Sequence, residues 1–466
     1  MRALTAQWVV NATGGELAAD VETVVTSVHQ DSRVVTQGSL YVAFVGERVD
    51  GHDFVDKAVA AGATLALVSQ PVAAPHILVD DVAVALGRLA RAYLALLRTE
   101  GEIRVIGITG SNGKTTTKDL LAQILPDAIA PAGSLNNEIG LPLTVLRADS
   151  STRNLVLELG ASAPGDIAYL TNIAPLDLAV VLTVGTAHAG GYANPQALAD
   201  EKASIIDGLV PGGVAILNAD DSQVAAMAGR ARSRSVRTFG TSLGADVRAV
   251  NVRLDGGCAR FDATVQAGAA GVGGPASEAV TLGIVGEHHV TNALAAVTVA
   301  LEAGMSLTAA AVGISAARPL SPHRMALTQR DDGVRILDDA YNASPESMRA
   351  ALRALLAVAD GGRTWAVIGE MREMGDASAF AHADVGHDAV RLNISHLVVV
   401  GDGARAAFDT AVREGSWGDE AMFVATIDEA HDLLAASLAP GDTVLVKASH
   451  GSGLWKLAKL LVEGHE

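Results

Sequence analysis

The most informative segment of the chain reads Ile108-Thr109-Gly110-Ser111-Asn112-Gly113-Lys114-Thr115-Thr116-Thr117. It follows a β-branched run, Arg104–Thr109, that is typical of a buried strand, and it opens a helical pattern over Thr115–Leu125. Glycines allow backbone N–H groups to converge on phosphate oxygens, and the first turn of a helix adds positive potential there. The order of strand, glycine-rich loop and helix therefore predicts a phosphate-binding turn in an α/β sheet.

Two side chains of this loop have the chemistry that nucleotide phosphates require. Lys114 can reach the β- and γ-phosphates, and the Thr115 hydroxyl can bind Mg²⁺. The strict spacing G-x-x-x-x-G-K-[ST] is missed, because Ile108 stands where the first glycine belongs. The alternative is a strand-to-helix turn with an incidental lysine. The flanking strand, the following helix and the run of threonines favour the phosphate loop.

Length, composition and charge indicate a globular protein with several domains. A chain of 466 residues is too long for one ordinary core, so we expect about two to four domains. Hydrophobic residues make up 49% and charged residues 18%, which argues against disorder. The net charge of -18 argues against a general nucleic-acid surface, because binding to the phosphate backbone requires positive charge. We expect no nucleic-acid partner.

Cysteine usage and hydropathy indicate the compartment. Cys258 is the only cysteine, so an internal disulfide is excluded, which fits a reducing environment. The opening residues Met1–Leu17 resemble neither a secretory signal nor a transmembrane span, and no long uninterrupted apolar stretch follows. We therefore expect a cytoplasmic protein without membrane insertion.

Short apolar runs alternate with helical patterns in three successive segments, which predicts an α/β fold of three domains. The first, 1–99, is a small α/β domain that ends at a polar linker. Its expected elements are strands Ser39–Val45 and Ala63–Val68, helices Phe54–Ala61 and Ala83–Leu97, and the linker Leu96–Glu102.

The central segment, 100–313, is a P-loop mononucleotide-binding domain with a mostly parallel sheet. Besides Arg104–Thr109, its expected elements are strands Asn154–Leu159, Leu178–Val184 and Val214–Asn218, an antiparallel excursion over Ala245–Ile284 that contains a loop at Ala267–Ala276, and a helix over His288–Ala303.

The last segment, 314–466, is a C-terminal Rossmann-like domain with a doubly wound layout. Its expected strands are Val334–Asp338, Thr364–Ile368, His396–Val400, Ala421–Ala425 and Thr443–Lys447. Gly401–Ala406 fits the dinucleotide pattern G-x-G-x-x-A, but no acidic ribose ligand follows at the expected distance. We interpret it as a tight strand-to-helix connection.

The loop also matches a shorter pattern, T-G-x-x-G-K-T-[ST], over Thr109–Thr116. Mur ligases and their folylpolyglutamate synthetase relatives carry this form, and the chain resembles Mur ligases over nearly its whole length. The resemblance implies an ATP-dependent ligase that requires two Mg²⁺ ions. It also implies that ATP contacts Thr109, Gly110, Ser111, Asn112, Gly113, Lys114, Thr115 and Thr116.

Two further stretches resemble the substrate-binding parts of the family. Asp31-Ser32-Arg33 and Asp50–Phe54 are similar to its uridine-binding domain, which implies that Ser32 and Arg33 contact the substrate. From the residues alone, Asp31–Arg33 is a capped turn with a surface ion pair. Leu135–Pro142 resembles the substrate-facing loop, in which the amides of Asn136 and Asn137 can donate and accept at once. Turn residues ahead of a helix explain these asparagines equally well.

Acidic and basic residues beside the loop suggest how metal is bound. Glu158 ends an apolar strand next to the phosphate loop, a place suited to Mg²⁺, although a solvated strand-end charge is the alternative. Without a family, His188 is a loop histidine and Lys202 a solvated helix residue. The resemblance implies that Lys202 is carbamylated and binds the second Mg²⁺ with His188, while Thr115 and Glu158 bind the first.

Motifs of the second half complete the resemblance. Gly286–Ala293 is similar to G-x-H-N-x-x-N, which implies that Asn292 approaches adenine; His289 replaces the usual asparagine. Pro322–Met325 resembles Gly-Arg-Met, with His323 in place of glycine and Arg324 expected to reach the γ-phosphate.

Two motifs of the last segment resemble one branch of the family, which adds D-alanyl-D-alanine. Asp338–Pro345 is close to D-D-x-Y-N-A-N-P, which implies that Asp339 contacts the ribose. Val446–Gly451 resembles K-G-S-R less closely, because Ala448 and His450 are substitutions.

The resemblance thus implies an amide ligase that joins D-alanyl-D-alanine to a UDP-linked muramoyl tripeptide in peptidoglycan synthesis. Its expected catalytic residues are Lys114, His188, Lys202 and Arg324, its partners are these small molecules and ATP, and we expect a monomer whose domains close over the site.

Three alternatives remain for the activity. A ligase that adds the third amino acid usually carries D-N-P-R, which we do not find. A folylpolyglutamate synthetase would lack the Asp31–Phe54 pattern. A non-catalytic nucleotide-binding protein would not need Lys114, Glu158, His188, Lys202 and Arg324 together.

Overall fold

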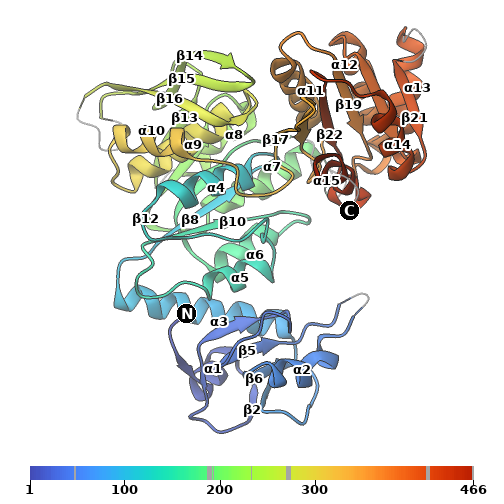
Figure 1. Ribbon diagram of the computed structural model, residues 1–466. Helices are drawn as coiled ribbons and strands as arrows, with labels where there is room; N and C mark the ends of the chain where they lie inside the picture. The colour runs from blue at the N-terminus through green and yellow to red at the C-terminus, as the bar shows by residue number, and fades with distance from the viewer. Residues whose placement is uncertain are drawn as a thin grey trace.

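The computed structural model describes residues 1–46, 49–185, 192, 194–231, 234–268, 274–415 and 420–463. Within them, three large sheets follow one another along the chain, each flanked by helices, and a short two-stranded sheet lies near the N-terminus (Figure 1). The mixed α/β fold predicted from the sequence is confirmed. Among the described residues, no helix is long and apolar enough to cross a membrane.

The N-terminal unit is built on a five-stranded sheet of order β2-β7-β6-β5-β4, in which only β2 runs antiparallel to its neighbour. The strands of this unit are β1 (Leu4–Thr5), β2 (Glu16–Ala18), β3 (Val24–Val25), β4 (Ser27–His29), β5 (Ser39–Val42), β6 (Ala63–Val68) and β7 (His76–Leu78). Its helices are α1 (Ala6–Thr13), α2 (Val55–Ala60) and α3 (Val82–Glu100).

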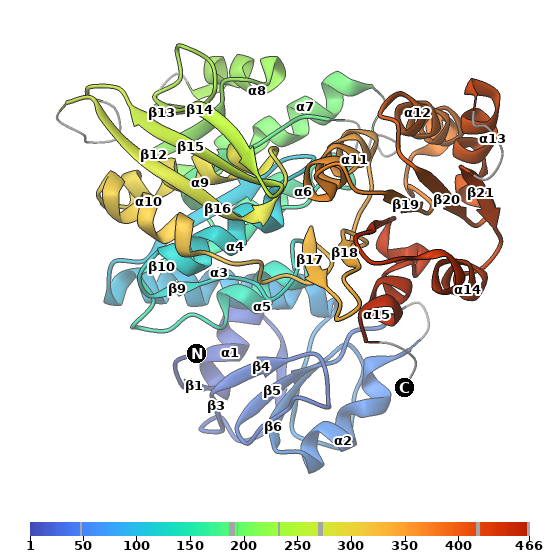
Figure 2. The ribbon, with the colours of Figure 1, turned by 45° about the horizontal axis from the view of Figure 1, so that its top comes forward.

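Helix α3 joins this unit to the next one and corrects the predicted linker Leu96–Glu102. The helix continues to Glu100, and Leu97 is buried in a core that both units share. The polar residues that suggested a linker belong to the last turns of the helix, where Arg98 donates to the carbonyl of Pro175 and pairs with Asp177 at 2.8 Å. Figure 2 shows α3 lying between the two units.

The central unit carries a nine-stranded sheet of order β16-β15-β14-β13-β12-β11-β8-β10-β9. Strands β9 to β14 pair in parallel, whereas β14, β15 and β16 pair antiparallel, which confirms the predicted excursion. The strands are β8 (Arg104–Thr109), β9 (Ala128–Ile129), β10 (Asn154–Glu158), β11 (Leu176–Val181), β12 (Leu209–Asn218), β13 (Ser235–Gly240), β14 (Val247–Asp255), β15 (Cys258–Val265) and β16 (Ala276–Val285).

Helices cover both faces of this sheet, because its central strands are apolar on both sides. Helices α4, α9 and α10 pack on one face, and α3, α5 and α6 on the other. The helices of the central unit are α4 (Lys114–Ile124), α5 (Gly140–Val145), α6 (Asp166–Ile173), α7 (Pro195–Ala203), α8 (Ser222–Ala226), α9 (His289–Glu302) and α10 (Leu307–Ala316). The predicted boundary between the last two domains, at residues 313 and 314, falls inside helix α10. The division of the chain into these domains stays a prediction.

The C-terminal unit has a six-stranded sheet of order β17-β18-β22-β19-β20-β21, parallel except for β17. Its strands are β17 (Ala326–Gln329), β18 (Arg335–Asp338), β19 (Thr364–Ile368), β20 (His396–Val400), β21 (Ala421–Val424) and β22 (Thr443–Lys447). Its helices, on both faces, are α11 (Pro345–Ala359), α12 (Ser378–Arg391), α13 (Arg405–Glu414), α14 (Ile427–Ser437) and α15 (Trp455–Glu463). This is the doubly wound layout that the sequence predicts.

Candidate active site

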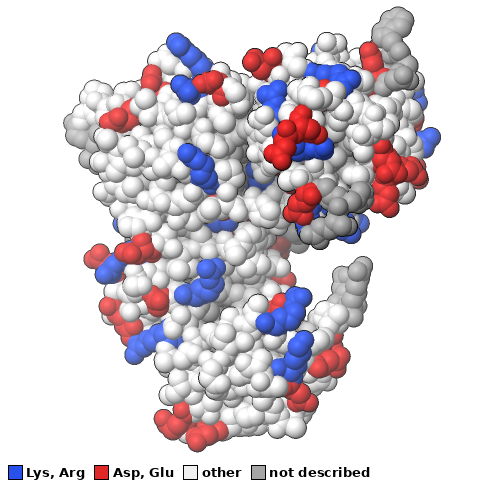
Figure 3. Space-filling view, in the orientation of Figure 1, with Lys and Arg blue, Asp and Glu red and all other residues white. Residues whose placement is uncertain are grey.

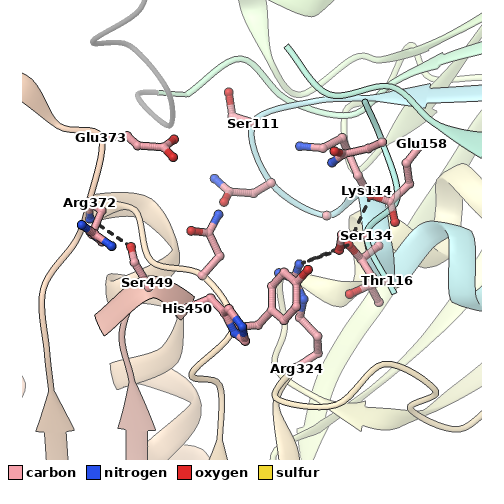
Figure 4. Close-up of a pocket in the computed structure, with 17 residues that line it drawn as sticks. Ser111, Lys114, Thr116, Ser134, Glu158, Arg324, Arg372, Glu373, Ser449 and His450 are labelled. Carbon is pink, nitrogen blue, oxygen red and sulfur yellow. Dashed lines mark hydrogen bonds between the residues drawn. The ribbon is translucent and has the colours of Figure 1, made fainter. Parts of the chain in front are cut away.

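The carboxyl ends of the central and C-terminal sheets face a common cavity of about 600 Å³. Lys114, Thr116, Ser134 and Glu158 lie on the central side of it (Figure 4). Its opposite side includes Arg372, Glu373, Ser449 and His450, and Arg324 lies between the two sides (Figure 4). The cavity therefore combines groups that the chain separates by more than three hundred residues.

The predicted order of strand, glycine loop and helix is observed, with α4 beginning at Lys114. Gly113 has φ 89°, and a Cβ there would collide with the Asn292 amide, so only glycine fits without strain. The loop is tied to the end of β11, because the backbone N–H of Asn112 donates to Thr183 Oγ1 at 3.2 Å. The Thr109 hydroxyl points away from the cavity and donates to the Leu159 carbonyl at 3.0 Å.

Lys114 is held over the loop, where Nζ donates to the Gly110 carbonyl at 2.5 Å. Loss of water around the ammonium lowers the pKa of Lys114 to about 8; nearby Glu158 opposes this shift and Arg324 adds to it. A cation in this position matches the charge of a bound polyphosphate.

Thr115 and Glu158 form an oxygen-rich corner below the loop. Thr115 Oγ1 lies 3.4 Å from Glu158 Oε2 and 2.9 Å from Ser134 Oγ. Glu158 is 1% exposed, and its Oε1 has no hydrogen-bond partner among the described residues. Burial raises the pKa of Glu158. A buried carboxylate oxygen beside a hydroxyl fits Mg²⁺, which prefers hard oxygen ligands.

Arg324 reaches from the start of the C-terminal unit into this corner. Its Nη2 lies 3.2 Å from Thr115 Oγ1 and 3.4 Å from Ser134 Oγ, and its guanidinium covers the Tyr341 ring at 4.1 Å. The flanking residues His323 and Met325 have φ of 59° and 51°. This left-handed turn explains why glycine suits position 323, where the chain carries histidine.

A second cavity of about 180 Å³ continues from the other side of Arg324 and the phosphate loop. It is lined by Asp339 and by Asn292, whose Nδ2 donates to His289 Nδ1 at 3.0 Å. Burial lowers the pKa of His289 well below its usual value, so the imidazole is neutral. Asp339 pairs with Lys447 at 2.5 Å, and Lys447 is 1% exposed. Lys447 was quoted in a motif but not predicted as a site residue.

Comparisons with known proteins agree with this geometry. Three family models match: the Mur ligase family catalytic domain over residues 24–94, the Mur ligase middle domain over 108–300, and the Mur ligase glutamate ligase domain over 323–450. The UDP-N-acetylmuramoyl-tripeptide--D-alanyl-D-alanine ligase of Mycobacterium leprae is 43% identical, with 98% of each chain covered. The chain belongs to the Mur ligase family.

Solved structures of other Mur ligases have the same architecture. MurF from Acinetobacter baumannii superposes with a TM-score of 0.87 at 32% identity, with 99% of each chain covered. MurF ligase from Thermotoga maritima, in complex with ADP, superposes with a TM-score of 0.78 at 28% identity over 94% of this chain and 97% of that one. The three-unit arrangement is therefore that of a Mur ligase.

The Mur ligase resemblance assigns Lys202 and His188 to the second metal, and the structure describes only Lys202. Lys202 on α7 is 1% exposed, so the alternative of a solvated helix lysine is wrong. Burial, and next the charge of Lys114, lowers the pKa of Lys202 to about 7. His188 lies outside the described residues. Within the part of the chain that the structure describes, no three His, Cys, Asp or Glu side chains form a metal cluster.

The predicted substrate residues of this Mur ligase are dispersed. Asn136 lines the large cavity, whereas the Asn137 side chain accepts from the Gly140 N–H at 2.9 Å, at the start of α5. Ser32 and Arg33 lie in the N-terminal unit and do not line the cavity. Arg33 pairs with Asp31 at 2.7 Å and holds the pKa of that carboxyl at about 2, as the turn interpretation predicts.

Several residues of the cavity were not predicted as site residues, among them Ser134, Arg372, Glu373 and His450. Ser134 follows Pro131 in a segment without a recognisable motif. Tyr341, Asn342, Ser449 and His450 lay within quoted motifs, which is the signal that could have found them.

Proposed function

We propose that the chain is an ATP-dependent, ADP-forming ligase that joins D-alanyl-D-alanine to UDP-N-acetylmuramoyl-tripeptide, a cytoplasmic step of peptidoglycan synthesis. The observation that supports ATP-dependent phosphoryl transfer is the contact of Arg324 with Thr115 of the phosphate loop. The substrates follow from the name of the Mycobacterium leprae relative, which is 43% identical over 98% of both chains. The ADP bound to the Thermotoga maritima relative supports ATP as the cosubstrate.

The reaction needs two anions to meet. The terminal carboxylate of the tripeptide attacks the γ-phosphorus of ATP, and the bond between this phosphorus and the β-phosphate oxygen breaks. The products of this step are an acyl phosphate and ADP. The amine of D-alanyl-D-alanine then attacks the acyl carbon, phosphate leaves, and the amine loses its proton. Catalysis of the first step is mainly positioning and neutralisation of charge, which Lys114 and Arg324 supply.

Thr115 and Glu158 would hold one Mg²⁺, and His188 with carbamylated Lys202 would hold a second. These ions supply further positive charge to the phosphate oxygens. A pKa of about 7 favours the carbamate at Lys202, because only the neutral amine adds CO₂. The modification turns a buried cation into an anion with two oxygen ligands.

We further propose that residues 1–99 bind the UDP moiety, that 100–313 bind ATP, and that 314–466 complete the site, with Asn292 at adenine and Asp339 at the ribose. Figure 3 shows a hollow between the N-terminal and C-terminal units, with Lys and Arg side chains on the N-terminal rim. Basic side chains there suit an anionic diphosphate substrate. We propose a monomer.

ADP release by the purified protein tests the assignment. We expect release with UDP-tripeptide and D-alanyl-D-alanine together, and background with the UDP-dipeptide and single amino acids. Activity with the second pair alone would identify the ligase that adds the third amino acid. Activity with a folate and glutamate would identify a folylpolyglutamate synthetase.

Substitution of Lys202 tests the carbamate. Lys202→Ala should lose most activity, and a small carboxylate in solution should restore part of it by taking the vacated ligand position. Full activity of the Ala variant, together with an unmodified amine far from any metal at high resolution, would contradict the proposal.

A further inference from the structure

A buried ion pair lies on α4, directly behind the phosphate loop. Lys118 and Asp119 are 2% and 5% exposed, and Nζ lies 2.5 Å from Oδ1. Neither side chain lines the cavity. Removal of two charges from water offsets most of their mutual attraction, so such a pair contributes little to stability. The other hydrogen bonds of the pair indicate what it does.

Lys118 holds the segment that carries Ser134. Its Nζ also donates to the carbonyl of Pro131 at 3.1 Å, three residues before Ser134. Ser134 Oγ in turn lies 2.9 Å from Thr115 Oγ1. Lys118 thereby fixes the position of this segment relative to α4.

Asp119 holds the connection that carries Arg324. Its second oxygen, Oδ2, accepts from the backbone N–H of Ser321 at 3.1 Å, three residues before Arg324. One turn further along α4, Gln123 accepts from the N–H of Arg318 and donates to its carbonyl, both at 3.0 Å. The connection between α10 and β17 is thus attached to the helix that begins at Lys114.

The two held segments meet at the phosphate loop. Arg324 Nη2 lies 3.4 Å from Ser134 Oγ and 3.2 Å from Thr115 Oγ1, and Thr115 belongs to the same helix as the ion pair. We propose that Lys118 and Asp119 are positioning residues that set Ser134 and Arg324 against Thr115. The proposal rests on the function above, in which Arg324 neutralises the transferred phosphoryl group. A displacement of about 1 Å at such a site can lower the rate on the order of 10²-fold.

A pair of matched substitutions tests the role. Asp119→Asn keeps the shape and removes the charge. Asp442→Asn is its control, because Asp442 is 3% exposed, pairs with Arg363 at 2.6 Å and accepts from the Ala439 N–H at 2.9 Å. Asp442 precedes β22 at the amino end of the strand, away from the cavity. Both variants lose a buried carboxylate, so both should unfold at lower temperature than the parent.

We expect only Asp119→Asn to lose kcat, roughly 10- to 100-fold, with KM for UDP-tripeptide unchanged within about twofold. Hydrogen exchange should accelerate at 131–134 and 318–324 in this variant and stay as in the parent in Asp442→Asn. Unchanged exchange in both segments, or kcat within twofold of the control, would overturn the proposal. If the parent lacks ligase activity, the proposed function fails, and the exchange comparison still tests the attachment.

A milder variant covers the case in which Asp119→Asn does not fold. Gln123 is exposed, so Gln123→Ala should leave the melting temperature unchanged. It releases only the attachment at Arg318, and we expect faster exchange over 318–321 with kcat reduced about two- to threefold. The absence of both effects would contradict the proposal.

Discussion

Two glycine-containing turns of this Mur ligase look alike in sequence and differ in use. One follows β8 and leads into α4 through Gly110–Lys114; the other follows β20 and leads toward α13 through Gly401–Ala404. Each comes after a buried parallel strand, and Gly113 and Gly401 have similar φ of 89° and 81°. The first lines both cavities, whereas the second lines neither.

The position of the strand in its sheet explains the difference. Strand β8 lies where the strand order reverses, with β10 on one side and β11 on the other. Strand β20 lies between β19 and β21, in simple chain order, whereas β22 is inserted out of order between β18 and β19. Turns after β18, β19 and β22 reach the cavity. Open α/β sheets bind ligands at such reversals, so topology decides which glycine turn becomes a site.

The largest expected effect comes from removing the cationic side chain that follows each turn, Lys114 or Arg405. Lys114→Ala should reduce ADP release on the order of 10²- to 10³-fold, because a cation facing the transferred phosphate is lost. Binding of UDP-tripeptide should survive, since we propose that the N-terminal unit binds the uridine. Arg405→Ala, at the start of α13, should leave ADP release unchanged. Steady-state assays and a binding isotherm measure both; near-normal turnover by Lys114→Ala would remove the phosphate-loop assignment.

A smaller effect separates the turns by the space around each glycine. A Cβ at Gly113 would collide with Asn292, whereas a Cβ at Gly401 meets nothing within 4 Å. Gly113, with ψ -14°, is in the left-handed α region, which costs an ordinary residue about 1–2 kcal/mol. Gly401, with ψ 153°, is in a region that almost only glycine adopts, which costs about 1–3 kcal/mol. We expect Gly401→Ala to lose that much stability with unchanged kcat. Gly113→Ala should also raise KM for ATP about 10- to 100-fold.

Urea unfolding and ATP titration of both variants measure these effects. Equal KM for ATP in the two variants would show that the packing against Asn292 has no part in nucleotide binding.

The sequence predicts those parts of the molecule that depend on local pattern. Strands β6, β8, β19, β20 and β22 match the expected ranges residue for residue, because each is a short apolar run bounded by polar residues. Strand β9 escapes because two residues carry no period, and β17 escapes because its sequence, Ala-Leu-Thr-Gln, is not an apolar run. The prediction of a linker at Leu96–Glu102 was wrong, because polar residues of a helix resemble a loop when the surface against which the helix packs is unknown.

Site residues divide in the same way. The phosphate loop is local and was predicted, whereas Arg372 and Glu373 follow β19 without a motif and reach the cavity only through the sheet order. Burial of Lys202 could not be read from α7, whose amphipathic pattern is weak because both of its faces carry charged and apolar residues. The pairing of Lys447 with Asp339 joins the ends of two neighbouring strands and needs the register of β18 and β22.

The smallest expected effect concerns the turn after β19, which reaches the cavity but is held differently from the phosphate loop. His382 on α12 is 0% exposed; its Nε2 accepts from the Met371 N–H at 2.8 Å, and its Nδ1 donates to the Ser378 carbonyl at 2.7 Å. The bond from Met371 needs the neutral imidazole, because a protonated Nε2 cannot accept, whereas the bond to Ser378 survives protonation. Burial lowers the pKa of His382 below 6.5, and the hydrogen bond to Ser378 and the charge of Glu370 only partly oppose this shift.

Acid should therefore weaken this turn. Below pH 6.5 the unfolded chain takes up a proton at residue 382 that the folded chain does not, so stability falls as the pH drops toward the lowered folded-state pKa. We expect the parent to lose more stability than His382→Gln between pH 7 and pH 5.5, by at most about 1 kcal/mol, since one pKa unit corresponds to about 1.4 kcal/mol. Urea unfolding of both proteins at the two pH values measures how much stability each one loses. The other histidines contribute equally to both losses, so their contributions cancel in the difference. Equal losses in both proteins would show that His382 does not hold the turn through its neutral form.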